Sequence, residues 1–86
     1  MENPIKLRAK PKEIEAIQWT NNEPFIRHFI QDDRLLRFPD SKLEIWNDEQ
    51  QCWIAVPMFH YVMKGIKGEL YPCSPEVLER SYEIIV

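Results

Sequence analysis

The segment from residue 64 to residue 76 constrains the fold more than any other part of the chain. It contains both glycines of the protein, two of its seven prolines, two lysines and a cysteine, set between apolar runs. Glycine reaches backbone angles that other residues resist, whereas proline fixes its own angle and removes a hydrogen-bond donor. We therefore expect a defined path here: a strand over 61–64, a tight connection over 65–68 and a returning strand over 69–71.

The size and composition of the chain indicate one small globular domain. With 86 residues it buries only about two-thirds of its unfolded surface. The hydrophobic content of 44%, with three Trp, three Tyr and four Phe, is enough for a core. We expect a single domain over residues 1–86, with residues 1–9 as a flexible basic arm, and a homo-oligomer that compensates for the small size.

The location of the protein is predicted from its first residues and its cysteines. No apolar run follows the N-terminal Met-Glu-Asn-Pro-Ile-Lys, and no segment approaches the length of a membrane span. Cys52 and Cys73 are far apart and lack metal-type spacing. These features favour free thiols in a reducing cytoplasm, and a disulfide between the two remains an alternative that geometry must decide.

The first half of the chain predicts a strand followed by a helix. Residues 13–20 carry apolar side chains on both faces, which is typical of a central strand covered on two sides. Asn22 and Pro24 are suited to a helix start. The apolar residues that follow, Phe25, Ile26, Phe29 and Ile30, form one stripe of an amphipathic helix over 24–32.

A period of two after residue 34 predicts a hairpin. Closing it about Asp48-Glu49 places Ile45 opposite Cys52 and Leu43 opposite Ile54. The same register puts Trp46 and Trp53 diagonally together on the other face. Two tryptophans on that face are costly to leave in water, so we expect the rest of this chain, a second subunit or a ligand to cover them.

The C-terminal part completes the expected fold. Ser74 as N-cap and Pro75 at the first helical position begin a short helix over 75–80. The last five residues, 82–86, are rich in β-forming types and are expected to close the sheet. The predicted fold class is α+β: one curved, mostly antiparallel sheet of five or six strands, one amphipathic helix and one short C-terminal helix.

The sequence contains no catalytic or metal-binding signature. Cys73 with His60 or His28 is the only candidate nucleophile and base, and Cys73 lies in an apolar, proline-flanked stretch that suits a packed thiol. Two His and two Cys occur without the short spacing of a metal site. We therefore predict a non-enzymatic protein with no catalytic residue, metal or cofactor.

Clustered aromatics beside the glycine-lysine turn indicate a ligand site. We expect Trp19 and Tyr71 to stack on a base, Lys64 and Lys67 to meet a phosphate, and Gln18 to read a polar edge. Packing in the core is the alternative role for these aromatics. Nucleic-acid binding is suggested by a basic stripe near the N-terminus, formed by Lys6, Arg8, Lys10 and Lys12. The net charge of −3 argues against it.

Two motifs resemble a family of small phage and prophage proteins of unknown function. They are KPxxIEAIQW at residues 10–19 and KGIKGELYPC at residues 64–73, and the likeness spans nearly the whole chain. The resemblance implies a phage origin and a setting in the bacterial host cytoplasm. Members carry Pro-Gly-Asp before the tyrosine at position 61, where this chain has Met58-Phe59-His60, so the turn there is left open.

Three functions follow as hypotheses. The first is a viral accessory protein that binds a small anionic ligand, such as a nucleotide signal of bacterial anti-phage immunity, and sequesters it as a sponge. The second is a protein–protein inhibitor or modulator of a host or phage enzyme, with Trp46 and Trp53 as its interface. The third is a nucleic-acid-binding accessory protein. None involves a membrane.

Overall fold

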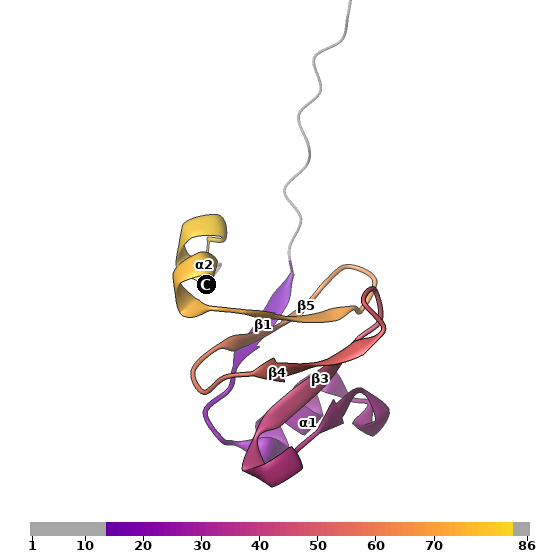
Figure 1. The fold of residues 1–86 in the computed structure, drawn as a ribbon. Helices are drawn as coiled ribbons and strands as arrows, with labels where there is room; N and C mark the ends of the chain where they lie inside the picture. The colour runs from indigo at the N-terminus through magenta and orange to yellow at the C-terminus, as the bar shows by residue number, and fades with distance from the viewer. Residues whose placement is uncertain (1–13, 84–86) are drawn as a thin grey trace, which may run out of the picture.

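The computed structural model describes residues 14–83, which form one small α+β domain as expected (Figure 1). The basic stripe, the arm over 1–9 and the end of the predicted C-terminal strand, 84–86, lie outside the described residues. The strands are β1 (Glu15–Gln18), β2 (Leu36–Arg37), β3 (Leu43–Asn47), β4 (Cys52–Val56), β5 (Tyr61–Lys64) and β6 (Leu70–Cys73). The helices are α1 (Glu23–Ile30) and α2 (Pro75–Ser81), with the 3-10 turns η1 (Asp33–Leu35) and η2 (Pro39–Ser41).

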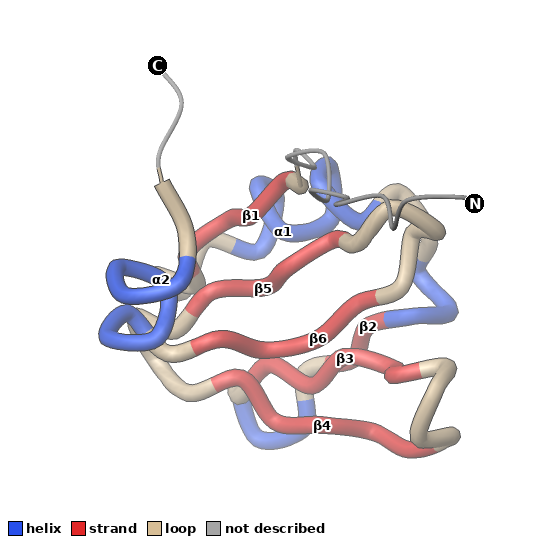
Figure 2. Tube along the Cα trace, turned by 90° about the horizontal axis from the view of Figure 1, so that it is seen from above, coloured by secondary structure: helices blue, strands red, loops and turns tan. Residues whose placement is uncertain are grey.

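The six strands form two antiparallel three-stranded sheets in place of the single expected sheet. Their orders are β1-β5-β6 and β2-β3-β4, and β6 packs against β3 and β4 (Figure 2). One core lies between the sheets. Its buried members come from both sheets and from α1: Trp19, Ile26, Ile30, Leu36, Leu43, Ile45, Val56, Val62 and Leu70.

The central strand of the first sheet is β5, so the central position predicted for residues 13–20 is wrong. Val62 of β5 faces the main core, while its neighbour Met63 packs with Cys73 and Leu78 in a second cluster. β1 pairs with β5 on one side only, and Glu15 and Ala16 are exposed. Apolar residues on both faces of β1 arise because Ile17 packs against the main core and Ile14 against the second cluster, although the strand lies at the edge of its sheet.

Helix α1 has the predicted start but a narrower buried stripe. The Asn22 side chain accepts a hydrogen bond from the backbone N–H of Phe25, and proline follows in the first turn. Ile26 and Ile30 are buried, whereas Phe25 is 64% exposed. The helix ends at Ile30 because Gln31 takes the left-handed conformation, with φ 61°, and its N–H bonds to the Arg27 carbonyl.

The β3–β4 hairpin has a different register from the predicted one. Ile45 lies opposite Ile54 and Leu43 opposite Val56, so Trp46 faces Trp53 directly and not diagonally. The turn between the strands therefore contains four residues, 48–51. Its shape depends on Asn47, whose Oδ1 accepts the Gln50 N–H at 2.7 Å, an interaction that residue spacing alone does not reveal.

The same asparagine joins the two sheets. Asn47 is only 4% exposed, and its Nδ2 donates to the Leu70 carbonyl of β6 at 2.8 Å. Both ends of the side-chain amide are thus bonded, which satisfies a polar group that burial would otherwise penalise. Asn47 therefore sets the β3–β4 turn and attaches it to the first sheet at one point.

The C-terminal segment agrees with the prediction as far as the end of α2. The Ser74 hydroxyl caps α2 by accepting the Val77 N–H, and Leu78 packs on the second cluster. Tyr82 and Glu83 follow α2 without joining a sheet, so the predicted strand is wrong for these two residues. Among residues 14–83 no helix has the length and apolarity needed to cross a bilayer.

Replacing Asn47 is expected to destabilise the whole domain. Asn47→Ala leaves the Leu70 carbonyl buried without its donor and frees the Gln50 N–H, a loss of about 1–3 kcal/mol. Urea unfolding followed by tryptophan fluorescence measures it. Gln50→Ala, in the same turn but exposed, serves as the control and should change stability little. Equal effects of the two variants would show that Asn47 does not join the sheets.

Candidate functional site

The five residues predicted to bind an anionic ligand do not assemble into one open site. Trp19 is only 2% exposed and packs on Phe38, with ring centroids 5.8 Å apart. Its backbone N–H donates to the His60 carbonyl at 2.8 Å. Trp19 is therefore a core residue, the alternative role stated for the aromatics, and in this structure it has no ring face open for stacking.

Gln18 and the turn it contacts are held by internal hydrogen bonds. The Gln18 Nε2 donates to the Phe59 carbonyl at 2.9 Å, and the Phe59 N–H donates to the Trp19 carbonyl at 2.8 Å. The turn closes from the His60 N–H to the Pro57 carbonyl at 3.0 Å. Phe59 occupies the positive-φ position, at 70°, where glycine is usual, so this turn forms without the Pro-Gly-Asp that the resemblance led us to expect.

The Lys64 ammonium stabilises the end of α1. Its Nζ donates to the Phe29 carbonyl in the last turn of that helix at 2.6 Å and lies 4.7 Å from the Phe29 ring centroid. A cation near the C-terminal carbonyls of a helix is favourable. The predicted phosphate contact of Lys64 competes with this bond.

The glycine-lysine turn already holds an anion of its own. The Glu69 Oε2 accepts the backbone N–H of Lys67 at 2.9 Å, and its carbonyl accepts that of Gly65. Gly68 has φ 81°, which needs glycine, whereas a Cβ at Gly65 would displace the Glu69 carboxylate. The two glycines therefore serve the turn, and the position where a phosphate was expected is occupied by Glu69.

Tyr71 is half-buried on β6 beside the second cluster. Burial, together with a hydrogen bond to Tyr82, raises the pKa of Tyr71 to about 12. Its phenol group therefore stays protonated to a higher pH than that of an exposed tyrosine. Of the five predicted residues, only Lys67 lines the hollow described next, so binding of a nucleotide stays a prediction that this geometry does not favour.

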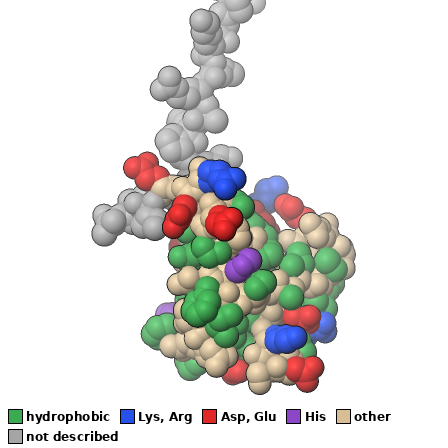
Figure 3. Space-filling view, turned by 60° about the vertical axis from the view of Figure 1, so that its left-hand side comes forward, with side chains coloured by type: hydrophobic (Ala, Val, Ile, Leu, Met, Phe, Trp, Pro, Cys, Tyr) green, Lys and Arg blue, Asp and Glu red, His purple; other side chains and the backbone are tan. Residues whose placement is uncertain are grey.

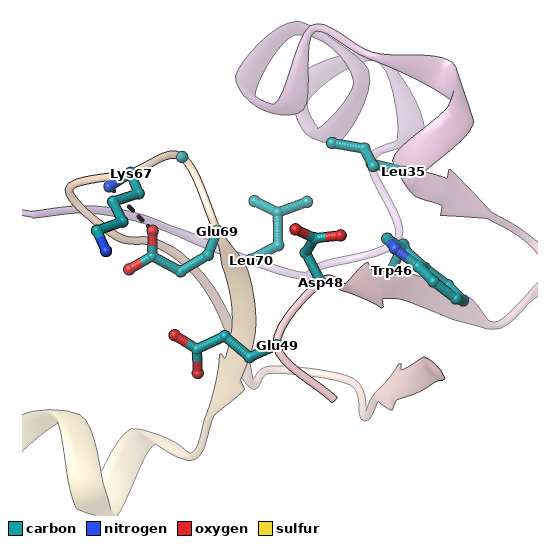
Figure 4. A pocket seen from close by; sticks show the side chains of 8 residues that line it. Leu35, Trp46, Asp48, Glu49, Lys67, Glu69 and Leu70 are labelled. Atoms are coloured by element: carbon teal, nitrogen blue, oxygen red, sulfur yellow. Dashed lines mark hydrogen bonds between the residues drawn. The ribbon is translucent and has the colours of Figure 1, made fainter. Parts of the chain in front are cut away.

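The hollow lies between the β3–β4 turn and the β5–β6 turn (Figure 4). It has a volume of about 420 Å³, and Lys67 and Glu69 enter it from one side while Asp48 and Glu49 enter from the other. Trp46, Leu35 and Leu70 add an apolar part of the lining. Three carboxylates face one ammonium, so the hollow carries a negative charge.

Beside the hollow, the outer face of the second sheet carries the predicted tryptophan pair. Trp46 and Trp53 are half-buried, with ring centroids 5.5 Å apart in an edge-to-face arrangement. The Arg37 guanidinium lies 4.3 Å from the Trp53 ring centroid and pairs with Glu44 at 2.6 Å. Of the three covers expected for this face, the described chain supplies one in part: both rings are half-buried, and Arg37 lies over Trp53.

Sequence reasoning gave no binding role to six residues of the hollow, among them its three carboxylates. Asp48 and Glu49 were assigned only to a polar turn, Glu69 only to a strand end, and Leu35 to no role. The acidic turn directly after Trp46 was the available signal, because a short turn places its side chains beside the end of its own strand. Their approach to Lys67 depends on the packing of the two sheets, which the local sequence does not encode.

Neither cysteine is hydrogen-bonded to a histidine among residues 14–83. Cys52 is half-buried and Cys73 buried, and both are free, as expected. Burial raises the pKa of the Cys73 thiol, which donates to the Ser74 carbonyl at 3.5 Å. Within residues 14–83 no three side chains of His, Cys, Asp or Glu come together as a metal site would require.

Compared with models of known families, with curated proteins and with solved structures, the chain matches none. The resemblance to phage proteins stays a prediction that rests on the two motifs.

The two lysines are expected to differ in their effect on stability. Lys64→Met keeps most of the apolar stem but removes the bond to α1, at a cost of about 1 kcal/mol. Lys67→Met is the matched control and should change the midpoint of thermal unfolding little, because this side chain is exposed. Thermal unfolding by circular dichroism measures both. A greater loss for Lys67→Met would contradict the assigned roles.

Stability is expected to fall at high pH because of Tyr71. The folded-state pKa of about 12 lies above the ordinary value of 10.0, so this contribution is complete below pH 10 and is lost as the pH rises toward 12. Tyr71→Phe should flatten the fall in unfolding free energy over that range, as measured by urea titrations at several pH values. An unchanged slope in the variant would assign the effect to other groups.

Proposed function

We propose that the protein is a protein-binding module, and that its docking surface is the outer face of Trp46 and Trp53 together with the adjoining hollow. The observation that carries the proposal is the edge-to-face tryptophan pair, which lies half-buried on the outer face of the second sheet beside the hollow. Tryptophan is enriched among the residues that dominate binding energy, especially beside pockets.

The arrangement of the two rings supports binding of a preorganised kind. The two rings pack against each other. The Arg37 guanidinium packs on the Trp53 ring and is also paired with Glu44. Side chains that are fixed before binding lose little entropy on association. An aromatic surface of this type suits an apolar patch on another protein.

The charge of the hollow favours a protein partner over a nucleotide. Asp48, Glu49 and Glu69 line it against one ammonium, that of Lys67. A phosphate placed there would meet like charges, whereas a lysine or arginine of a partner would meet opposite charges. The partner we propose therefore has a basic group beside an apolar patch.

The resemblance to phage proteins gives the proposal its setting. In that setting the module acts in the bacterial host cytoplasm as an inhibitor or modulator of a host or phage enzyme. Sequestration of a small anionic ligand is the competing function, and it needs the Glu69 carboxylate to leave the Lys67 N–H.

Removal of either tryptophan is expected to weaken partner binding strongly. The partner is first captured from infected host cells by the tagged wild-type protein, and its affinity is then measured by calorimetry with the purified components. Trp46→Ala or Trp53→Ala should weaken binding roughly 30-fold, the effect of losing about 2 kcal/mol at a hot spot. Phe25→Ala, an exposed aromatic on α1, is the control and should leave the affinity unchanged.

Two results would overturn the proposal. One is a partner whose affinity is the same for the wild-type protein and both tryptophan variants. The other is binding of a nucleotide from a panel of cyclic and ADP-ribose-type compounds that Glu69→Gln strengthens, because this would place an anion at the Lys67 turn.

A further inference from the structure

The outer strands of the two sheets differ in how they are protected against pairing. An exposed strand edge pairs readily with other chains unless a charge, a proline or shortness prevents it. β1 carries Glu15, β6 carries Pro72, and β2 has only two residues, one of which is Arg37. Each of these three strands therefore has one of the usual devices.

β4 has none of these devices. Its sequence is Cys-Trp-Ile-Ala-Val, five residues without a charge or a proline. Its described pairing is with β3 alone, and in Figure 2 it forms the outermost strand of its sheet. Ile54 stays half-buried although its partner across the hairpin, Ile45, is fully buried, so the unpaired side of β4 leaves apolar surface exposed.

We propose that β4 is an interface for a second copy of this chain, in which the two β4 strands pair antiparallel about a two-fold axis. A symmetric pairing centred on Ile54 places this residue opposite its own copy. Cys52 then lies opposite Val56, and Trp53 lies opposite Ala55, of the other subunit. The β2-β3-β4 sheet of one subunit and that of the other then form one sheet of six strands.

The side chains of β4 suit a copy of themselves. Every pair in this register is apolar, so no charge is desolvated and no like charges meet. The large Trp53 ring is matched by the smallest side chain of the strand, the exposed Ala55. Ile54 and Cys52, both half-buried, lose their remaining exposure on the inner face.

The pairing also extends the docking surface proposed above, although it does not depend on it. Trp46 and Trp53 lie on the outer face of the sheet, so the dimer brings two tryptophan pairs onto one continuous face. Charged side chains on the flanks, such as Glu44 and Arg37, are already paired within each subunit.

The oligomeric state of the full chain tests the inference with two matched variants. Ala55→Lys places on β4 the charge that other edges carry, and within its own subunit the new lysine faces Glu44, so the fold is retained. Ala16→Lys makes the same change at an exposed alanine of the other outer strand, β1. Circular dichroism verifies that both variants are folded.

Native mass spectrometry and light scattering should then give a dimer for the wild type and for Ala16→Lys, and a monomer for Ala55→Lys. We expect the dimer dissociation constant to rise at least tenfold in Ala55→Lys. A monomeric wild type, or an Ala55→Lys variant that dimerises as the wild type does, would refute the β4 interface.

A disulfide reports the register directly. Residues directly opposite in an antiparallel pair lie within the Cα separation that a disulfide tolerates. In a Cys52→Ser background, Ile54→Cys should form a covalent dimer under mild oxidation, whereas Ala16→Cys should not. Equal crosslinking of the two variants would show that contact between β4 strands is not specific.

Discussion

The arrangement of the two sheets depends on one buried amide. Asn47 ends β3, accepts the Gln50 N–H and donates to the Leu70 carbonyl. An apolar residue at this position would leave the Leu70 carbonyl without a donor, and a charged one would be desolvated. This side chain therefore determines both the length of the β3–β4 turn and the point at which that turn meets β6.

The hollow follows from this contact. Because Asn47 holds the β3–β4 turn against the start of β6, Asp48 and Glu49 come close to the β5–β6 turn, where Glu69 and Lys67 lie (Figure 4). Glu69 in turn bonds the Lys67 N–H and occupies the turn from within. The resulting acidic hollow beside Trp46 explains why the geometry favours a partner with basic groups over a phosphate-bearing ligand.

Apolar side chains are also exposed away from the hollow, where α2 covers the first sheet incompletely. Figure 3 shows hydrophobic side chains gathered around a histidine. Exposed apolar residues elsewhere in the chain include Met58 and Phe59 of the β4–β5 turn, and Val77 of α2. α2 has only seven residues and buries Leu78 alone, so it covers the first sheet incompletely. Incomplete cover of apolar side chains is usual in a small domain, whose surface is large relative to its volume.

The sequence by itself determined the local elements of this protein. The caps at Asn22 and Ser74, the β5–β6 turn with its two glycines and the alternation in β3 and β4 depend on neighbours a few residues apart, so they could be predicted. The tryptophan pair was also predicted, since the predicted and the observed register both bring the two rings to one face.

Only the tertiary structure decided the rest. The division into two sheets, the burial of Trp19, the bond from Lys64 to α1 and the register set by Asn47 are contacts between segments far apart in the chain. The sequence shows that a lysine or an amide is present but not whether a carbonyl distant in sequence will satisfy it. That outcome depends on which apolar faces pack together, because packing determines which polar groups lose water and must find a partner.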